Sequence, residues 1–284
     1  MGSESFWNED PSELLRVRTG LRLADVDPEG HPGIHGSKRD GVNALELGAG
    51  ILADLQERLF ASSRLGDRRR VLLVLQAMDS AGKGGIVKHV MGSVDPQGVA
   101  LTAFKKPTEE ELGHDFLWRI SKAAPGPGMI GVFDRSHYED VLIGRVRELA
   151  PPEEIERRYD AINGFERGLV AGGTAVIKVM LHISREEQRD RLAARLARPE
   201  KHWKFNPGDI DERERWADYQ RAYEVVFERT STPDAPWYVV PANHKWYARL
   251  AVQHLLVDAL ERMELEWPKA DYDVDEQRAR LAAS

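Results

Sequence analysis

The chain has 284 residues, no cysteine and a formal net charge of −7. The lack of cysteine excludes disulfides, thiolate catalysis and cysteine-ligated metals, and the acidic balance disfavours a nucleic-acid-binding module, which usually carries a basic excess. We find neither a signal-peptide pattern nor an apolar run near the roughly 18 residues of a membrane span. We therefore expect a cytoplasmic protein that binds neither nucleic acid nor membranes.

The segment 1–42 is rich in Gly, Pro and Asp and has little periodicity, which predicts an irregular N-terminal arm. We expect a single domain over 43–284, beginning with a helix over 43–63. Five β-favouring runs then alternate with helical stretches, which predicts an α/β fold whose parallel sheet is covered on both faces. The runs are Val71–Leu75, Val99–Phe104, Met129–Phe133, Ala175–Leu181 and Trp237–Val240, and later helices are expected near 184–198, 213–230 and 244–264.

Residues 71–85 carry the clearest functional pattern. The apolar run leads into a loop of small residues that ends in Gly82-Lys83-Gly84-Gly85, and a helix is expected from Ile86. Strand, loop and helix in this order form a P-loop, in which backbone N–H groups and the lysine bind a phosphate. The alternative is a Gly-rich turn without a ligand. Because Gly84 replaces the Ser or Thr hydroxyl that normally touches Mg²⁺, we expect Asp79 to bind the metal instead.

A second acidic site follows the third β-like run. Asp134 ends this run, and open parallel sheets bind ligands at the carboxyl ends of their strands. The strand commonly lies beside the P-loop strand, which would bring Asp134 and Asp79 near one Mg²⁺. Arg135 offers a planar donor fork for a phosphate. The simpler alternatives are a helix-capping role for Asp134 and a surface ion pair for Arg135.

Basic residues gather in two further places. Arg191, Arg195 and Arg198 share one helical face and precede the charged, irregular segment 199–211, as in a lid that closes over phosphates. Interleaved acidic residues leave a solvated, salt-bridged helix as the alternative. Lys105, Lys106, Arg119 and Lys122 follow the second run, where an anion could bind.

Taken together, these motifs make the chain resemble the polyphosphate kinase 2 family from about residue 40 to 265. The family likewise tolerates Gly at position 84, whereas Ala77 stands where many members have Gly. The motifs are LQAMDSAGKGG (75–85), FKKPTEEELGHDFLWR (104–119), FDRSHYEDVL (133–142), LHISREEQ (181–188), PEKHWKF (199–205) and APWYVVPANHKWYARL (235–250).

The resemblance implies a three-layer α/β/α sandwich similar to thymidylate kinase, with a five-stranded parallel P-loop kinase sheet and a helical lid near 185–215. It implies catalytic roles for Asp79, Lys83, Asp134, Arg135, Arg191 and Arg195. It implies substrate binding by Ala81, Gly82, Gly84, Gly85, Lys105, Lys106, Arg119, Glu139, Lys201 and Lys204. Glu139 in the sequence SHYED resembles the branch that phosphorylates both AMP and ADP.

The expected reaction is a reversible transfer of the terminal phosphate of inorganic polyphosphate to AMP or ADP, giving ADP or ATP. It would depend on Mg²⁺, with Mn²⁺ as a second candidate ion, held by Asp79 and Asp134. We expect a homo-oligomer, either a dimer or a tetramer. The alternatives are an ATP-dependent small-molecule or nucleotide kinase of thymidylate-kinase type, and a nucleotide-binding switch without net transfer.

Overall fold

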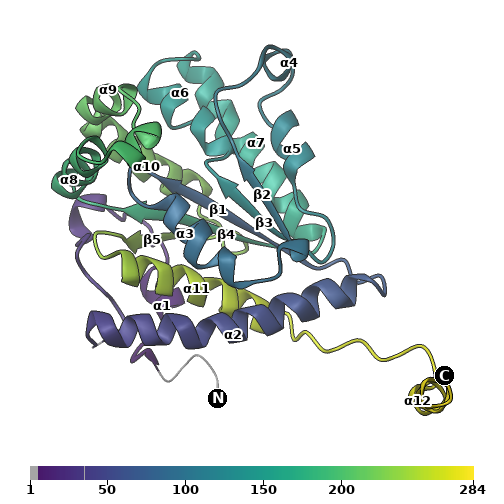
Figure 1. Cartoon of the computed structure of the whole chain (residues 1–284). Helices are drawn as coiled ribbons and strands as arrows, with labels where there is room; N and C mark the ends of the chain where they lie inside the picture. The colour runs from purple at the N-terminus through teal and green to yellow at the C-terminus, as the bar shows by residue number, and fades with distance from the viewer. Residues whose placement is uncertain (1–5, 35) are drawn as a thin grey trace.

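A five-stranded parallel sheet lies at the centre of the molecule (Figure 1). The computed structural model describes residues 6–34 and 36–284. The strand order is β2-β3-β1-β4-β5, so β3 and β4 flank the strand that leads into the phosphate loop. The strands are β1 (Arg70–Ala77), β2 (Val99–Ala103), β3 (Ile130–Asp134), β4 (Thr174–His182) and β5 (Trp237–Pro241). Each of the five expected runs therefore forms a strand, and β3 lies beside β1 as predicted.

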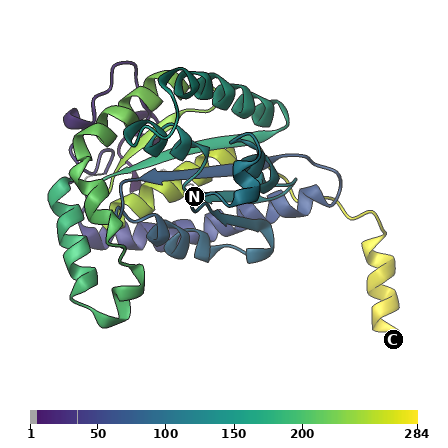
Figure 2. The ribbon, with the colours of Figure 1, turned by 90° about the horizontal axis from the view of Figure 1, so that it is seen from above.

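Helices cover both faces of the sheet, and Figure 2 shows the sheet lying between two helical layers. The helices are α1 (Pro11–Leu14), α2 (Lys38–Ser63), α3 (Lys83–His89), α4 (Glu109–Leu112), α5 (Trp118–Ala123), α6 (Ile143–Val146), α7 (Pro152–Ala171), α8 (Arg185–Leu196), α9 (Gly208–Glu214), α10 (Trp216–Thr230), α11 (Lys245–Glu261) and α12 (Val274–Ala282). The expected α/β/α sandwich is confirmed.

Alternation along β1 explains the two layers. Successive side chains of a strand point to opposite faces, and β1 is apolar at every position from Val71 to Leu75. Val71, Leu73 and Leu75 pack in one core with α2, α3 and α11. Leu72 and Val74 pack in a second core with α7 and α10. An uninterrupted apolar run is therefore what a central strand buried on both faces requires.

Several expected helices differ in their bounds. The first begins at Lys38, because the Ser37 and Asp40 side chains form a capping box there. The spacing of Leu112, Phe116 and Ile120 predicts one helix, but the structure divides this stretch between α4 and α5. Thr108 caps α4, which ends at Leu112, and α5 begins at Trp118. The helix after the phosphate loop begins at Lys83 rather than Ile86.

The N-terminal arm packs on the edge of β5. Val17 N–H donates to Trp237 O at 2.8 Å, and Val239 N–H donates to Leu15 O at 2.9 Å, which forms an antiparallel bridge. Most of the arm is irregular apart from α1 and a short 3-10 turn at Leu23–Asp25. Residues 1–5 and 35, which belong to the expected arm, lie outside the described residues. Among the helices described, we find none with the length and apolarity to cross a bilayer.

Candidate active site

A cavity of about 700 Å³ opens at the carboxyl ends of the strands, which is the edge where open parallel sheets bind ligands. The phosphate loop, the end of β3, the segment after α8 and the start of α11 contribute to its wall. The residues expected from the sequence that line it are Asp79, Ala81, Gly82, Lys83, Gly84, Gly85, Lys105, Asp134, Arg135, Arg195, Lys201 and Lys204. The sequence motifs thus meet in one place.

The phosphate loop connects β1 to α3 through two residues with positive φ. Gly82, the residue before α3, has φ 123°, a conformation that favours glycine. Ser80 has φ 67°, which is uncommon for a residue with a side chain. A Cβ added at Gly84 would meet no protein atom within 4 Å, so the space beside this residue is open. Lys83 extends along the loop, and its Nζ donates to Ala77 O at 3.4 Å.

Arg135 and Asp79 form an ion pair inside the cavity. Arg135 Nη2 lies 2.9 Å from Asp79 Oδ1, and the Arg135 backbone also has positive φ, 63°. The Arg135 N–H donates to Leu75 O at 3.1 Å, which ties the end of β3 to β1. Burial lowers the pKa of Arg135, but the carboxylates of Glu139 and Asp79 raise it by more. Arg135 is therefore a charged group held at the sheet edge, facing the phosphate loop.

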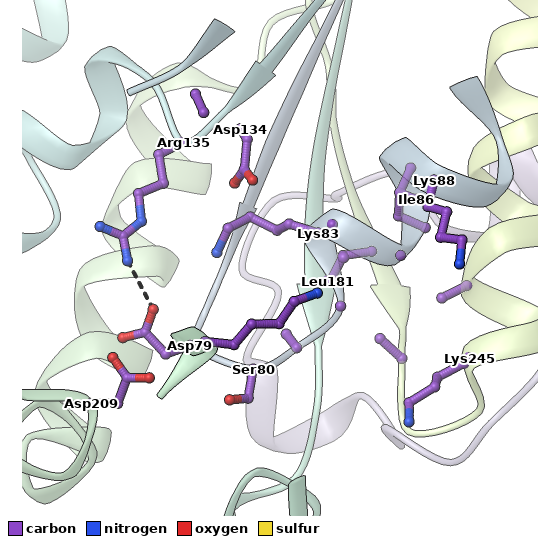
Figure 3. A pocket seen from close by; sticks show the side chains of 18 of the residues that line it. Asp79, Ser80, Lys83, Ile86, Lys88, Asp134, Arg135, Leu181, Asp209 and Lys245 are labelled. Carbon is purple, nitrogen blue, oxygen red and sulfur yellow. Dashed lines mark hydrogen bonds and ion pairs between the residues drawn. The ribbon is translucent and has the colours of Figure 1, made fainter. Parts of the chain in front are cut away.

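The acidic and cationic side chains converge at one end of the cavity. Figure 3 shows Asp79, Lys83, Asp134, Arg135 and Asp209 facing a common space. The described residues contain no cluster of three or more His, Asp or Glu side chains that could hold a metal by themselves. Two carboxylates beside a phosphate loop still fit Mg²⁺, because this ion is usually bound by one or two carboxylates together with substrate phosphates.

Asp209, in α9, is a cavity residue that the sequence analysis missed. Its side chain is largely buried, and Arg195 Nη1 lies 3.4 Å from its Oδ2. Burial and the nearby Asp79 carboxylate raise the pKa of Asp209 to about 6. The sequence alone does not single out Asp209, because it is one of several acidic residues in a charged segment. Its position depends on how the segment folds back over the sheet edge.

The sequence analysis also missed a group of basic residues in the cavity, which we call the basic wall. Lys88 and His89 at the end of α3 and Lys245 and Arg249 at the start of α11 also line the cavity. Figure 3 shows Lys88 and Lys245 on the side away from the carboxylates. Burial and the neighbouring cations Arg249 and Lys88 lower the pKa of His89. Burial lowers the pKa of Lys245, as does Arg191. Lys245 and Arg249 are spaced i, i+4 on one helical face, which was a readable signal.

Glu139 lies in a smaller hollow of about 180 Å³ that adjoins the main cavity. Asp79 and Arg135 line both spaces, and Tyr219 and Tyr223 also line the smaller one. Burial raises the pKa of Glu139, although the cations Arg135 and Lys83 oppose the change. An amphipathic group bound beside the phosphate site would meet aromatic rings and an acidic side chain here.

Besides Glu139, three expected residues are not in the lining of the main cavity. Lys106 and Arg119 line a neighbouring hollow of about 350 Å³, which Lys105 shares with the main cavity. Arg119 Nη1 donates to Lys105 O at 2.9 Å, so its guanidinium partly supports the lysine segment. Arg191, expected to face substrate from the lid, is not among the residues lining the cavity. Arg191 is buried, and its guanidinium donates hydrogen bonds to the backbone carbonyls of Ala81 and Ala242.

Comparison with known proteins identifies the family to which the chain is similar. The family described as polyphosphate kinase 2 (PPK2) matches residues 36–268. The chain is 44% identical over 251 residues to the AMP/ADP-polyphosphate phosphotransferase of Meiothermus ruber, covering 88% of this chain and 92% of the relative. It is 44% identical over 266 residues to the ADP-polyphosphate phosphotransferase of Rhodopseudomonas palustris, covering 89% of each.

A solved structure extends the similarity to the fold. The crystal structure of polyphosphate kinase 2 from Arthrobacter aurescens TC1 is 59% identical in sequence and superposes with a TM-score of 0.96. The match covers 98% of each chain.

Proposed function

The chain belongs to the polyphosphate kinase 2 family, and from this premise we propose that it transfers phosphate reversibly between inorganic polyphosphate and the nucleotides AMP and ADP, giving ADP and ATP. The observation that carries the proposal is one cavity that joins a phosphate loop, two carboxylates and a long basic wall. A cavity this cationic suits a polyanion, even though the whole chain is acidic.

The two substrates would approach from opposite sides of the phosphate loop. Lys88, His89, Lys245 and Arg249 extend the cavity as a basic wall that could follow a chain of phosphates. The hollow beside Glu139 offers aromatic rings, which suit a nucleoside better than a polyphosphate. We therefore assign the basic wall to the donor and the hollow to the acceptor, so that both meet at Lys83.

Asp79 and Asp134 would hold Mg²⁺, and Mn²⁺ is a second ion that such oxygen ligands accept. When bound, the ion neutralises charge on the phosphates that are brought together. Lys83 and the loop amides would bind the transferring phosphate, while Arg135 and Arg195 would offset the charge that spreads over its oxygens. The chain itself supplies mainly positioning and charge, which is what phosphoryl transfer requires.

The elements after α8 would serve as a lid. Lys201 and Lys204 in the 3-10 segment Pro199–Lys204 line the cavity, and so does Asp209 in α9. Closure over bound phosphates would exclude water and suppress hydrolysis of the donor. The presence of Glu139 and the relative named for both AMP and ADP support a chain that accepts both nucleotides.

The test combines purified protein, Mg²⁺ and polyphosphate with AMP or ADP, and separates the nucleotides formed. We expect ADP and ATP from AMP, and ATP from ADP, well above a control without enzyme. A parallel reaction replaces polyphosphate with ATP and adds a small-molecule acceptor. Product in this second reaction alone would refute the proposal and favour an ATP-dependent kinase.

A further inference from the structure

Two buried side chains of α8 reach the outer side of the phosphate loop. Gln188 Nε2 donates to Asp79 O at 3.0 Å. Arg191 Nη1 donates to Ser80 O at 3.2 Å and to Ala81 O at 2.6 Å. Three consecutive carbonyls of the loop thus have donors from one helical face, because residues three apart on a helix are neighbours.

Arg191 also joins the loop to a second segment. Its Nη2 donates to Ala242 O at 2.6 Å and Asn243 O at 3.0 Å, in the turn between β5 and α11. Its Nε pairs with Glu187 Oε1 at 2.6 Å, one helical turn away. Every nitrogen of the guanidinium therefore has a protein partner, so this arginine acts on the site from behind the loop.

The direction of these carbonyls determines the direction of the amides. In a trans peptide the C=O and the following N–H point to opposite sides. When Ala81 O points to Arg191, the N–H of Gly82 points away from it, and Gly82 lines the cavity. The N–H of Ala81 is used within the loop, where it donates to Met78 O at 3.2 Å.

The backbone at Ser80 also needs support. A positive φ of 67° is sparsely populated for a residue with a Cβ and persists only where neighbouring groups fix it. Gln188 and Arg191 bond the carbonyls immediately before, at and after Ser80. These hydrogen bonds therefore hold Ser80 in a backbone conformation that would otherwise relax.

We propose that Gln188 and Arg191 are positioning residues that hold the phosphate loop in its anion-binding conformation, with the Gly82 amide turned toward the donor phosphate. Arg191 adds a fixed positive charge behind the loop. A Cβ at Gly82 would lie 3.7 Å from Arg191 Nη1, so the cation sits directly against the backbone that would bind phosphate. This proposal rests on the proposed function of the cavity as a phosphate site.

The test measures binding of inorganic tripolyphosphate by calorimetry, together with turnover on polyphosphate and ADP, for Arg191→Lys and Gln188→Met. Lysine keeps the charge but lacks the planar fork that reaches both segments. The matched control is Arg70→Lys at the opposite end of β1, where Arg70 donates to Gly172 O at 2.9 Å and to Thr174 Oγ1 at 2.9 Å.

We expect Arg191→Lys to weaken tripolyphosphate binding at least tenfold and Gln188→Met to weaken it severalfold. We expect Arg70→Lys to bind like the wild type, and all three variants to give a wild-type circular dichroism spectrum at the assay temperature. Wild-type affinity in folded Arg191→Lys would overturn the proposal. A wild type that binds tripolyphosphate but transfers no phosphate would refute the proposed function alone, since the binding comparison would still test the loop.

Discussion

At the scale of single residues, Asp209 is buried as a carboxylate among other charges of the cavity. Its pKa rises from 3.8 to about 6, first because of burial and then because of Asp79. Above pH 6 the Asp209 carboxyl is charged in both the folded and unfolded states. The folded state is then destabilised, because it buries this charge beside Asp79. Between about pH 6 and 4 the folded state takes up a proton that the unfolded state does not, so this cost disappears as the pH falls.

Asp209→Asn should therefore raise the free energy of unfolding at pH 7.5, on the order of 1–3 kcal/mol in EDTA and without substrates. The gain should shrink toward zero as the pH falls to about 4. Urea unfolding of both proteins across this range measures the difference. A gain that is constant with pH, or a loss at pH 7.5, would contradict the raised pKa.

Asp79 and Asp134 carry the metal assignment. Asp79→Asn and Asp134→Asn should each lower kcat on polyphosphate and ADP by roughly 10²- to 10³-fold, the size expected when one charge-organising group is lost. Melting temperatures should stay close to that of the wild type. Asp234→Asn, in the exposed segment before β5, serves as the control with unchanged activity. If either variant retains most of the wild-type kcat, the substituted residue does not hold the metal.

At the scale of elements, α2 and α11 approach closely because glycines lie at their contact. A Cβ added at Gly41 would lie 2.2 Å from the Trp246 ring, whereas one added at Gly50 would meet nothing within 4 Å. Both glycines lie in the same helix, and Ala is the better helix former by about 0.5–1 kcal/mol. The pair therefore separates a packing effect from helix propensity.

Gly41→Ala should lower the free energy of unfolding by about 1–3 kcal/mol, because the Trp246 ring must shift out of a packed position. Gly50→Ala should raise it by about 0.5–1 kcal/mol. Thermal and urea unfolding of the two variants measure both changes. If the two substitutions changed the free energy of unfolding in the same direction, the inferred close packing of α2 against Trp246 would be contradicted.

A buried ionic network links β4 and α7 to Tyr138, in the short 3-10 turn that follows β3. Lys178 Nζ lies 2.6 Å from Glu166 Oε2 and 3.0 Å from Tyr138 Oη, and its side chain is fully buried. Burial lowers the pKa of Lys178, opposed by Glu166. Removing one partner of such a pair leaves an uncompensated buried charge.

Lys178→Met should therefore destabilise the protein by about 3–5 kcal/mol. Adding Glu166→Leu should recover a good part of this loss, because no buried charge then remains unpaired. Urea unfolding of the single and double variants forms the test. A double variant less stable than Lys178→Met would show that the pair itself, and not the unpaired carboxylate, is what stabilises this region.

At the scale of the whole molecule, a chain with net charge −7 holds a strongly basic cavity. The sheet makes this possible, because it brings separate basic segments to one edge. Lys83 follows β1, Lys105 follows β2 and Lys245 follows β5. The net charge of the whole chain therefore does not predict which ligands the cavity binds. The local positive field at the strand ends attracts the anionic substrates.

The strands and the phosphate loop could be predicted from the sequence because their signals are local. The apolar run at 71–75 and the glycines at 82, 84 and 85 depend only on near neighbours. The role of Arg191 could not be predicted in this way. Its i, i+4 spacing with Arg195 suggested a shared substrate-facing surface, yet Arg195 lines the cavity and Arg191 turns under the loop.

Asp209 and the basic wall were missed for a similar reason. Asp209 reaches the site only because α9 folds back toward the phosphate loop, and Lys88 and Lys245 line the same cavity only because α3 and α11 pack together. Contacts between distant segments depend on the tertiary arrangement, which single-sequence patterns do not encode. The motif containing Lys245 supported the family resemblance, but the resemblance gave no role to that residue.

The central claim is that one cavity passes phosphate directly from polyphosphate to a nucleotide. The most direct measurement follows the transfer of label from ³²P-polyphosphate to ADP in a single turnover, for the wild type and for Lys83→Met. We predict labelled ATP with the wild type, no label retained on the protein, and a rate for Lys83→Met that is lower by about 10²-fold or more. Labelled ATP formed by Lys83→Met at the wild-type rate, or label trapped on the protein before ATP appears, would contradict the account.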